Sequence, residues 1–130
     1  MRNPVKNMPS ADQALLFDQQ MAYWQDKLCL GDWRIERGSK SAKGAMASVE
    51  FNQPARLATY RIGDFGAEKI TPDSLKKTAL HECLHVLMHD LIETATDRGS
   101  SAEQIEAAEH RVINVLERIL TKESHAITKS

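Results

Sequence analysis

The chain has 130 residues, of which 42% are hydrophobic, and a formal net charge of −1 at pH 7. This length fits one domain with a single hydrophobic core and does not favour a second domain. The balanced charge argues against broad binding to nucleic acid or to an anionic membrane. A small basic cluster, which we interpret as a solvated loop, comprises Arg34, Arg37, Lys40 and Lys43. No apolar run resembles a signal peptide or a membrane span, so we expect a cytoplasmic protein.

Residues 10–30 are predicted to form an N-terminal helix that packs on the core. Residues 9–12 have the composition of a helix cap, and the apolar residues that follow recur at helical spacing. These apolar residues are Ala14, Phe17, Met21, Trp24 and Leu28. The residues before this helix, 1–9, are predicted to be flexible.

Three short strands are predicted next, at residues 33–36, 45–51 and 57–62, because each segment alternates or is rich in strand-forming residues. Residues 38–44 are rich in Gly, Ser and Lys and are predicted to form a mobile hairpin loop, and residues 52–54 mark the next turn. We therefore expect a three-stranded antiparallel sheet.

A long central helix is predicted to begin near residue 72. Thr71 suits the N-cap, Pro72 the first helical position and Asp73 the first turn. Apolar residues then recur every three or four positions, and Gly99 marks the end of the region. They are Leu75, Ala79, Leu80, Leu84, Leu87, Met88 and Leu91.

The middle of this helix carries the pattern H-E-x-x-H, at His81, Glu82 and His85. Residues four apart lie on one helix face, with β-carbons about 5–6 Å apart, so both imidazoles can reach one zinc ion. Glu82 points to the adjoining part of that face, where it can take a proton from the attacking water. The pattern therefore predicts a zinc hydrolase site.

A catalytic zinc usually has a third protein ligand. His89 is about 12 Å from His81 along a continuous helix, so it is better suited to a flanking role. The longer H-E-x-x-H-x-x-G-x-x-H pattern is excluded, because Met88 and Leu91 occupy the positions of its glycine and third histidine.

An acid on the next helix is the remaining candidate for the third ligand. Residues 102–120 read as an amphipathic helix whose apolar residues are Ile105, Val112, Leu116 and Ile119. Glu109 falls among them, and a carboxylate facing a core needs a partner such as a metal ion. Glu106, one turn earlier and nearer the polar side, is the rival ligand. Residues 122–130 are predicted to be a flexible tail.

Residues 72–120 resemble the gluzincin-type zinc metallopeptidases, in which a glutamate on a following helix completes an H-E-x-x-H site. The short chain is most similar to the minigluzincins and to small metallopeptidase-like proteins of bacteria and phages. The resemblance implies zinc ligands His81, His85 and Glu109, and a water-polarising Glu82. It also implies that an edge strand of the upstream sheet binds a peptide or protein substrate in extended form. The chain departs from the family at Ile113, where an aspartate often steadies a zinc-binding histidine.

The expected fold is therefore α+β: an N-terminal helix, a small antiparallel sheet, the active-site helix and a C-terminal helix that supplies the glutamate ligand. All of residues 1–130 would form one minimal zincin-like domain. His110 is the candidate we single out to stabilise the oxyanion, because it follows Glu109; Tyr60, His89 and Arg111 are the other candidates.

Three functions are compatible with this pattern. The first is an active zinc peptidase, which a partner, the tail or a cysteine could hold latent. The second is a catalytically idle zinc domain that acts as a protein-interaction or regulatory module. The third is a protein without metal. A DNA-associated protease would need a more basic surface. The oligomeric state is left open.

The two cysteines, Cys29 and Cys83, are expected to be buried reduced thiols. Cys83 lies two positions from each motif histidine, which turns it about 160° away from them on the helix. We therefore do not expect Cys83 to bind zinc or act as a nucleophile.

Overall fold

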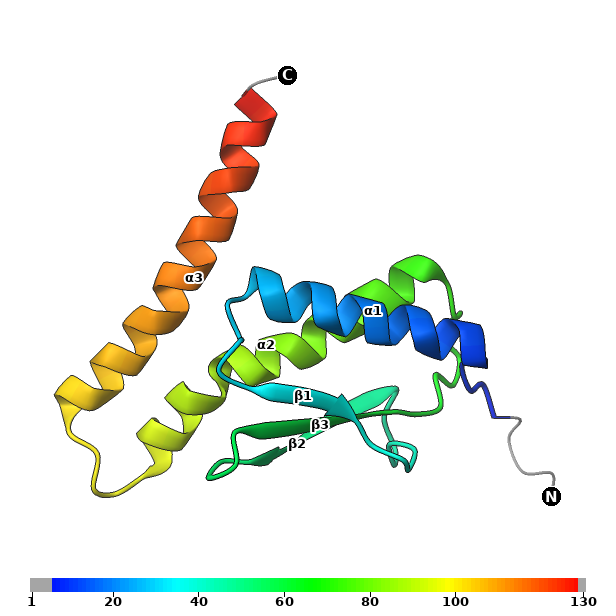
Figure 1. Ribbon diagram of the computed structural model, residues 1–130, viewed down its shortest axis with the longest axis horizontal. Coiled ribbons are helices and arrows are strands. Elements are labelled where there is room, and N and C mark those ends of the chain that lie inside the picture. Colours follow the sequence, from blue (N-terminus) through cyan, green and yellow to red (C-terminus); the bar gives the residue numbers. More distant parts are fainter. Residues whose placement is uncertain (1–5, 129–130) are drawn as a thin grey trace.

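The structure, a computed structural model, describes residues 6–128 of the chain, with side chains described up to Lys122. Its elements are α1 (Ala11–Lys27), β1 (Arg34–Arg37), β2 (Ala47–Asn52), β3 (Leu57–Ile62), α2 (Pro72–Thr96) and α3 (Ala102–Thr128). Helices α1 and α2 lie together over one face of the sheet, whereas α3 leaves the far end of α2 and projects away from the body (Figure 1). The α+β class and the order of the elements are confirmed.

The predicted N-terminal helix is α1. Ser10 caps it in a capping box, because the Ser10 side chain accepts the Gln13 N–H and the Gln13 side chain accepts the Ser10 N–H. Phe17 and Met21 are buried completely or almost so, at 0% and 1% exposure, and they form the centre of the core. Of the polar residues between them, Gln19 is exposed, whereas Asp18 and Gln20 are half-buried.

The sheet is mixed, so the prediction of an antiparallel sheet was wrong. Its strand order is β1-β3-β2, with β1 parallel and β2 antiparallel to β3. After β1 the chain continues beside β3, where the Gly38 N–H donates to the Tyr60 carbonyl at 2.7 Å and the Ala42 N–H to the Ile62 carbonyl at 3.2 Å. The chain then crosses to the far edge. Residues 38–44 are therefore a crossover and not a hairpin loop.

Helix α2 begins as predicted, with Thr71 as N-cap and Pro72 in the first turn, and it ends at Thr96, shortly before Gly99. One face of α2 is buried against α1, and Cys83 lies at its centre, with Sγ 3.7 Å from the Met21 Sδ. The other residues buried on α2 are Leu75, Ala79, Glu82, Val86 and Leu87. The histidines of the motif lie on the opposite, exposed face.

Helix α3 is longer than predicted and turns a different face to the body. Val112 and Val115 are buried, whereas Leu116 is 37% exposed and Glu109 is exposed. The prediction that Glu109 and Leu116 share the core-facing side was therefore wrong. Of the terminal segments predicted to be flexible, residues 1–5 and 129–130 lie outside the described residues, and residues 122–128 are the end of α3.

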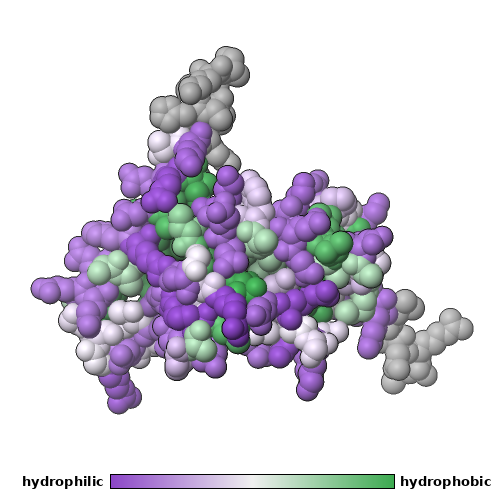
Figure 2. Space-filling view, viewed as in Figure 1, coloured by the Kyte–Doolittle hydropathy of each residue, from purple (hydrophilic) through white to green (hydrophobic). Residues whose placement is uncertain are grey.

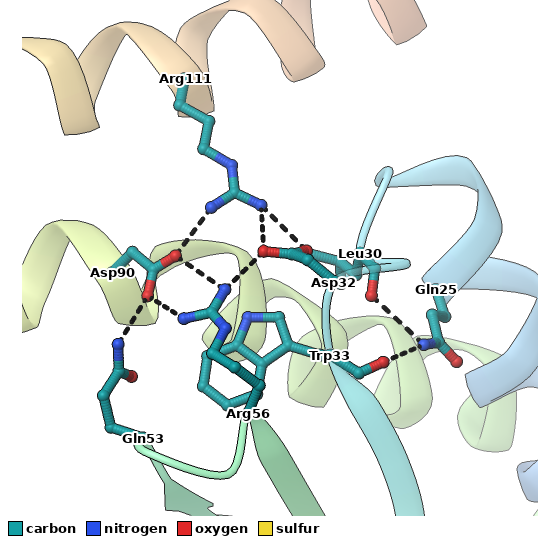
Figure 3. A network of polar contacts seen from close by, with 8 residues as sticks. All are labelled: Gln25, Leu30, Asp32, Trp33, Gln53, Arg56, Asp90 and Arg111. Atoms are coloured by element: carbon teal, nitrogen blue, oxygen red, sulfur yellow. Dashed lines mark hydrogen bonds and ion pairs between the residues drawn. The ribbon is translucent and has the colours of Figure 1, made fainter.

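Four charged side chains from separate segments tie α3 to the body (Figure 3). Arg111 of α3 donates to Asp90 of α2 at 2.7 Å and to Asp32, in the turn before β1, at 3.0 Å. Arg56, between β2 and β3, donates to the same two carboxylates. The Arg56 guanidinium also lies 3.9 Å above the Trp33 ring. These alternating charges fix where α3 crosses α2.

The network predicts a specific loss of stability in acid. The Arg56 hydrogen bond is the main reason why the pKa of Asp90 is held below its ordinary value. The stabilisation is complete above the ordinary pKa of an aspartate, about 3.9, and is lost as the pH falls through the lower folded value. The Asp90→Asn variant is therefore expected to be less stable than the native protein at pH 7, with the difference shrinking towards pH 2–3.

Urea unfolding of both proteins at several pH values measures this difference. Asp26→Asn is the matched control, because Asp26 is exposed and lies outside the network. It should show no such pH-dependent difference. The prediction would be contradicted if the free energies of unfolding of the native protein and Asp90→Asn differed by the same amount from neutral to acid pH.

Polar residues cover most of the face seen in Figure 2, and apolar residues form small separate patches on it. Leu15 and Tyr23 of α1 and Leu120 of α3 are among the large apolar side chains exposed on the molecule. Within residues 6–128, no helix combines the length and apolar character needed to cross a membrane.

Candidate metal site

The two motif histidines converge on one point at the surface of α2. Their Nε2 atoms are 3.2 Å apart, and the rings, with centroids 4.9 Å apart, are nearly perpendicular at 77°. Both side chains are exposed, so the nitrogens are accessible from solvent.

This separation fits a shared zinc ion. Two nitrogens that are each 2.0–2.1 Å from a tetrahedral zinc are about 3.3–3.4 Å apart. The observed 3.2 Å is close to that value without any change of rotamer. His81 and His85 are thus arranged as a pair of zinc ligands would be.

Glu82 lies beside the pair but, unlike the histidines, is only 5% exposed. Burial raises the pKa of its carboxyl group, and the neighbouring His85 and His81 partly offset this effect. Among the described residues, none donates a hydrogen bond to its carboxylate. Glu82 is therefore a mostly buried carboxyl group beside the two histidines, without a hydrogen-bond donor among the described residues.

The structure does not bring the predicted acid ligands to the histidine pair. Glu109 and Glu106 are both exposed on α3. Asp90, which Arg111 contacts, already lies about 7.5 Å beyond His85 along α2, and Glu109 is roughly 200° around α3 from Arg111. Among the side chains that the structure describes, no group of three or more His, Cys, Asp or Glu is arranged to hold a metal ion. Glu109 as a ligand stays a prediction.

The residues considered for the oxyanion also lie elsewhere. His110 is exposed on α3, and Arg111 belongs to the ion-pair network. Tyr60 donates its hydroxyl proton to Asp18 at 2.7 Å, and burial, together with this contact, raises the pKa of Tyr60 far above its usual range. None of these three side chains lines the cavities beside Glu82.

His89 packs against two aromatic residues. Its ring stacks on the Phe51 ring, with centroids 3.9 Å apart, and meets the Trp33 ring edge-on at 5.4 Å. Phe51 in turn lines the cavity next to His85. The flanking role predicted for His89 is therefore a packing contact that joins β2 to α2.

The cysteines differ from each other. Cys83 is fully buried, and burial raises the pKa of its thiol to about 12, with the charge of Glu82 adding to the effect. Both cysteines are free, as predicted, but Cys29 is exposed, so the expectation that it is buried was wrong. Leu28 and Leu30 fill the core on either side of Cys29, which turns outwards with a positive φ of 57°.

Strand β2 lies alongside the histidine face of α2, and no strand among residues 6–128 pairs with its outer edge. The Gly63 N–H donates to the Met46 carbonyl at 2.7 Å, and the antiparallel register continues from that pair. Because hydrogen-bonded and non-hydrogen-bonded pairs alternate, Ala47, Val49 and Phe51 direct their backbone N–H and C=O groups away from β3. All three residues line the cavity that holds His81, Glu82 and His85.

Two further residues near the site were not predicted. Glu68, in the connection before α2, and Lys77, one turn before His81, line the cavity on the N-terminal side of Glu82. The spacing of Lys77 from His81 could have indicated its place on the histidine face. Nothing in the sequence brings Glu68 to the same cavity.

Comparisons with models of protein families, with curated proteins and with solved structures gave no match. The function of the site must therefore be inferred from its residues and their geometry.

Proposed function

We propose that this protein is a zinc-dependent metallopeptidase. The observation that carries the proposal is the 3.2 Å separation of the His81 and His85 Nε2 atoms beside the buried carboxylate of Glu82. Zinc bound by these two nitrogens would supply Lewis acidity, which lowers the pKa of water and polarises a peptide carbonyl.

Glu82 is the general base in this proposal. Its raised pKa makes the carboxylate a stronger base than an exposed glutamate, and Glu82 lines both cavities beside the histidine pair, where it can take a proton from water. Glu82 accepts the proton of the attacking water and later passes a proton to the leaving amine. No other described glutamate or aspartate lines both cavities beside the histidine pair.

The free edge of β2 holds the substrate. The outward N–H and C=O groups of Ala47, Val49 and Phe51 can pair with an extended peptide as a further strand. Such a peptide would pass along the groove between β2 and α2, which brings its carbonyl groups to the histidine pair. The other edge strand, β1, packs near α1, away from the site.

Glu109 is proposed as the third protein ligand, and this requires α3 to turn. In the present arrangement Arg111 holds α3 to Asp32 and Asp90, and Glu109 faces solvent. Bringing Glu109, with the adjacent His110, to the histidine face of α2 would require α3 to leave the contacts of Arg111 with Asp32 and Asp90.

Metal content tests the proposal. The purified native protein is expected to contain about one zinc per chain by elemental mass spectrometry, and His85→Ala should lose it, because the pair can no longer chelate the ion. Glu109→Ala should bind zinc more weakly if α3 turns as proposed.

The zinc contents of the native protein and of Glu109→Ala test two parts of the proposal separately, namely the peptidase assignment and the role of Glu109. Zinc that is absent from the native protein, even after the metal is added back, would overturn the peptidase assignment. Zinc that is unchanged in Glu109→Ala would remove Glu109 from the site and leave the histidine pair as its protein ligands. Glu103→Ala, an exposed acid in the first turn of α3, is the matched control for Glu109→Ala.

A further inference from the structure

Two cavities meet at Glu82, one on each side. The first, of about 550 Å³, lies between residues 45–47 and the first turns of α2, and Glu68 and Lys77 line it. The second, of about 310 Å³, is lined by Val49, Phe51 and His85 on the other side of Glu82. Ala47, His81 and Glu82 line both cavities, so the two cavities adjoin and together form a groove with Glu82 between its two halves.

A peptidase that removes single terminal residues needs a site closed on one side, with a charge that holds the free terminus. Here space continues on both sides of Glu82. The charged side chains of the first cavity, Glu68 and Lys77, have opposite signs, so a terminal amine or carboxylate placed there would be attracted by one of them and repelled by the other. The groove therefore suits the interior of a chain.

We propose that the protein is an endopeptidase that cleaves within an extended polypeptide and takes a neutral side chain between Glu68 and Lys77. This inference rests on the proposed peptidase function and adds the class of substrate. It is carried by the two cavities and by the charges at the rim of the first.

The rim charges explain why a neutral side chain is preferred. Glu68 and Lys77 are both exposed, and within the described structure neither is in an ion pair. A substrate carboxylate would be attracted by Lys77 and repelled by Glu68, and an ammonium or guanidinium group would meet the reverse. A charged side chain therefore gains little net attraction for the hydration that it loses. A neutral side chain avoids both contacts and can pack its stem on Ala45 and Met46, which line the same cavity.

Peptides with blocked ends test the position of cleavage. A ten-residue peptide that is acetylated and amidated is expected to be cut internally, at a rate within about twofold of the same peptide with free ends. Mass spectrometry identifies the products. Removal of terminal residues alone, with blocked peptides left intact, would overturn the inference while leaving the peptidase function standing.

A binding measurement keeps the inference testable without turnover. The same blocked peptide, carrying a fluorophore, is titrated with the Glu82→Gln variant, and it should bind as tightly as the free-ended peptide. If the protein binds the blocked peptide but hydrolyses no peptide, the proposed peptidase function is wrong, whereas binding of the interior of a chain along the groove is supported. Absence of binding by the blocked peptide, with binding of the free one, overturns the inference.

Charge substitutions at Glu68 and Lys77, on the rim of the first cavity, test the proposed preference for a neutral side chain. Lys77→Glu would place two carboxylates at the first cavity and is expected to favour Lys or Arg at one position beside the scissile bond, by roughly five- to tenfold. Glu68→Lys should favour Asp or Glu at the same position. Lys76→Glu, the exposed neighbour that does not line the cavity, is the matched control. Unchanged preferences in both rim variants would overturn the role of Glu68 and Lys77.

Discussion

The Glu82→Gln variant is expected to bind zinc as the native protein does and to hydrolyse peptides about 10²–10⁴-fold more slowly, the usual contribution of a general base. Glutamine has nearly the shape of glutamate, so the packing of α2 on α1 should be unaffected. It cannot accept a proton, however, so the attacking water loses its base. Steady-state rates on a peptide substrate, together with zinc content, measure both halves of the prediction.

Glu93→Gln is the matched control for Glu82→Gln. Glu93 lies on the same helix, three turns further on, and is exposed, so its replacement should leave the rate unchanged. A Glu82→Gln protein that still performs the native function with its zinc retained would contradict the catalytic assignment. That result would instead support a zinc domain that acts by binding.

The part of the site that could be predicted from the sequence is local. His81 and His85 are four residues apart on one helix, and helix geometry alone places their side chains together. Thr71 and Pro72 similarly determine where α2 begins, because an N-cap and a first-turn proline act through neighbouring residues only. For these features, no knowledge of the tertiary structure was needed.

Glu109 shows where this reasoning fails. The apolar residues of α3 are spread over a broad arc of the helix surface. Glu109 lies at one side of this arc, next to Leu116. Which side of the arc faces the body depends on contacts with other segments. Burial of Val112 and Val115, and the contacts of Arg111 with Asp90, turn Glu109 outwards.

The prediction of the strand pairing in the sheet failed for a related reason. Alternation along a strand predicts which side chains face the core, and the three strands were placed to within one or two residues. Alternation does not say which strands are neighbours. The crossover after β1 sends β2 to the far edge, and this is what leaves the β2 edge free beside Glu82.

Phe17→Ala is expected to lower the free energy of unfolding by about 3–5 kcal/mol, a large part of the total of about 5–15 kcal/mol for a domain. Phe17 has no exposed surface, and its ring lies 5.8 Å from that of Tyr60, where α1 meets the sheet. Its removal leaves a cavity that these elements cannot fill. Leu15→Ala, on the same helix but 55% exposed, should change stability by less than about 0.5 kcal/mol.

The same variant tests whether stability and metal binding are carried by opposite faces of α2. The buried face, with Ala79 and Cys83, packs against α1, whereas His81 and His85 face the groove. Below its unfolding temperature, Phe17→Ala should therefore still bind about one zinc per chain, because two histidines on a single helix keep their spacing when the packing behind them loosens. Urea unfolding and zinc titration of one preparation measure both properties. Zinc lost in step with stability would mean that the site depends on α1 packing and not on the helix alone.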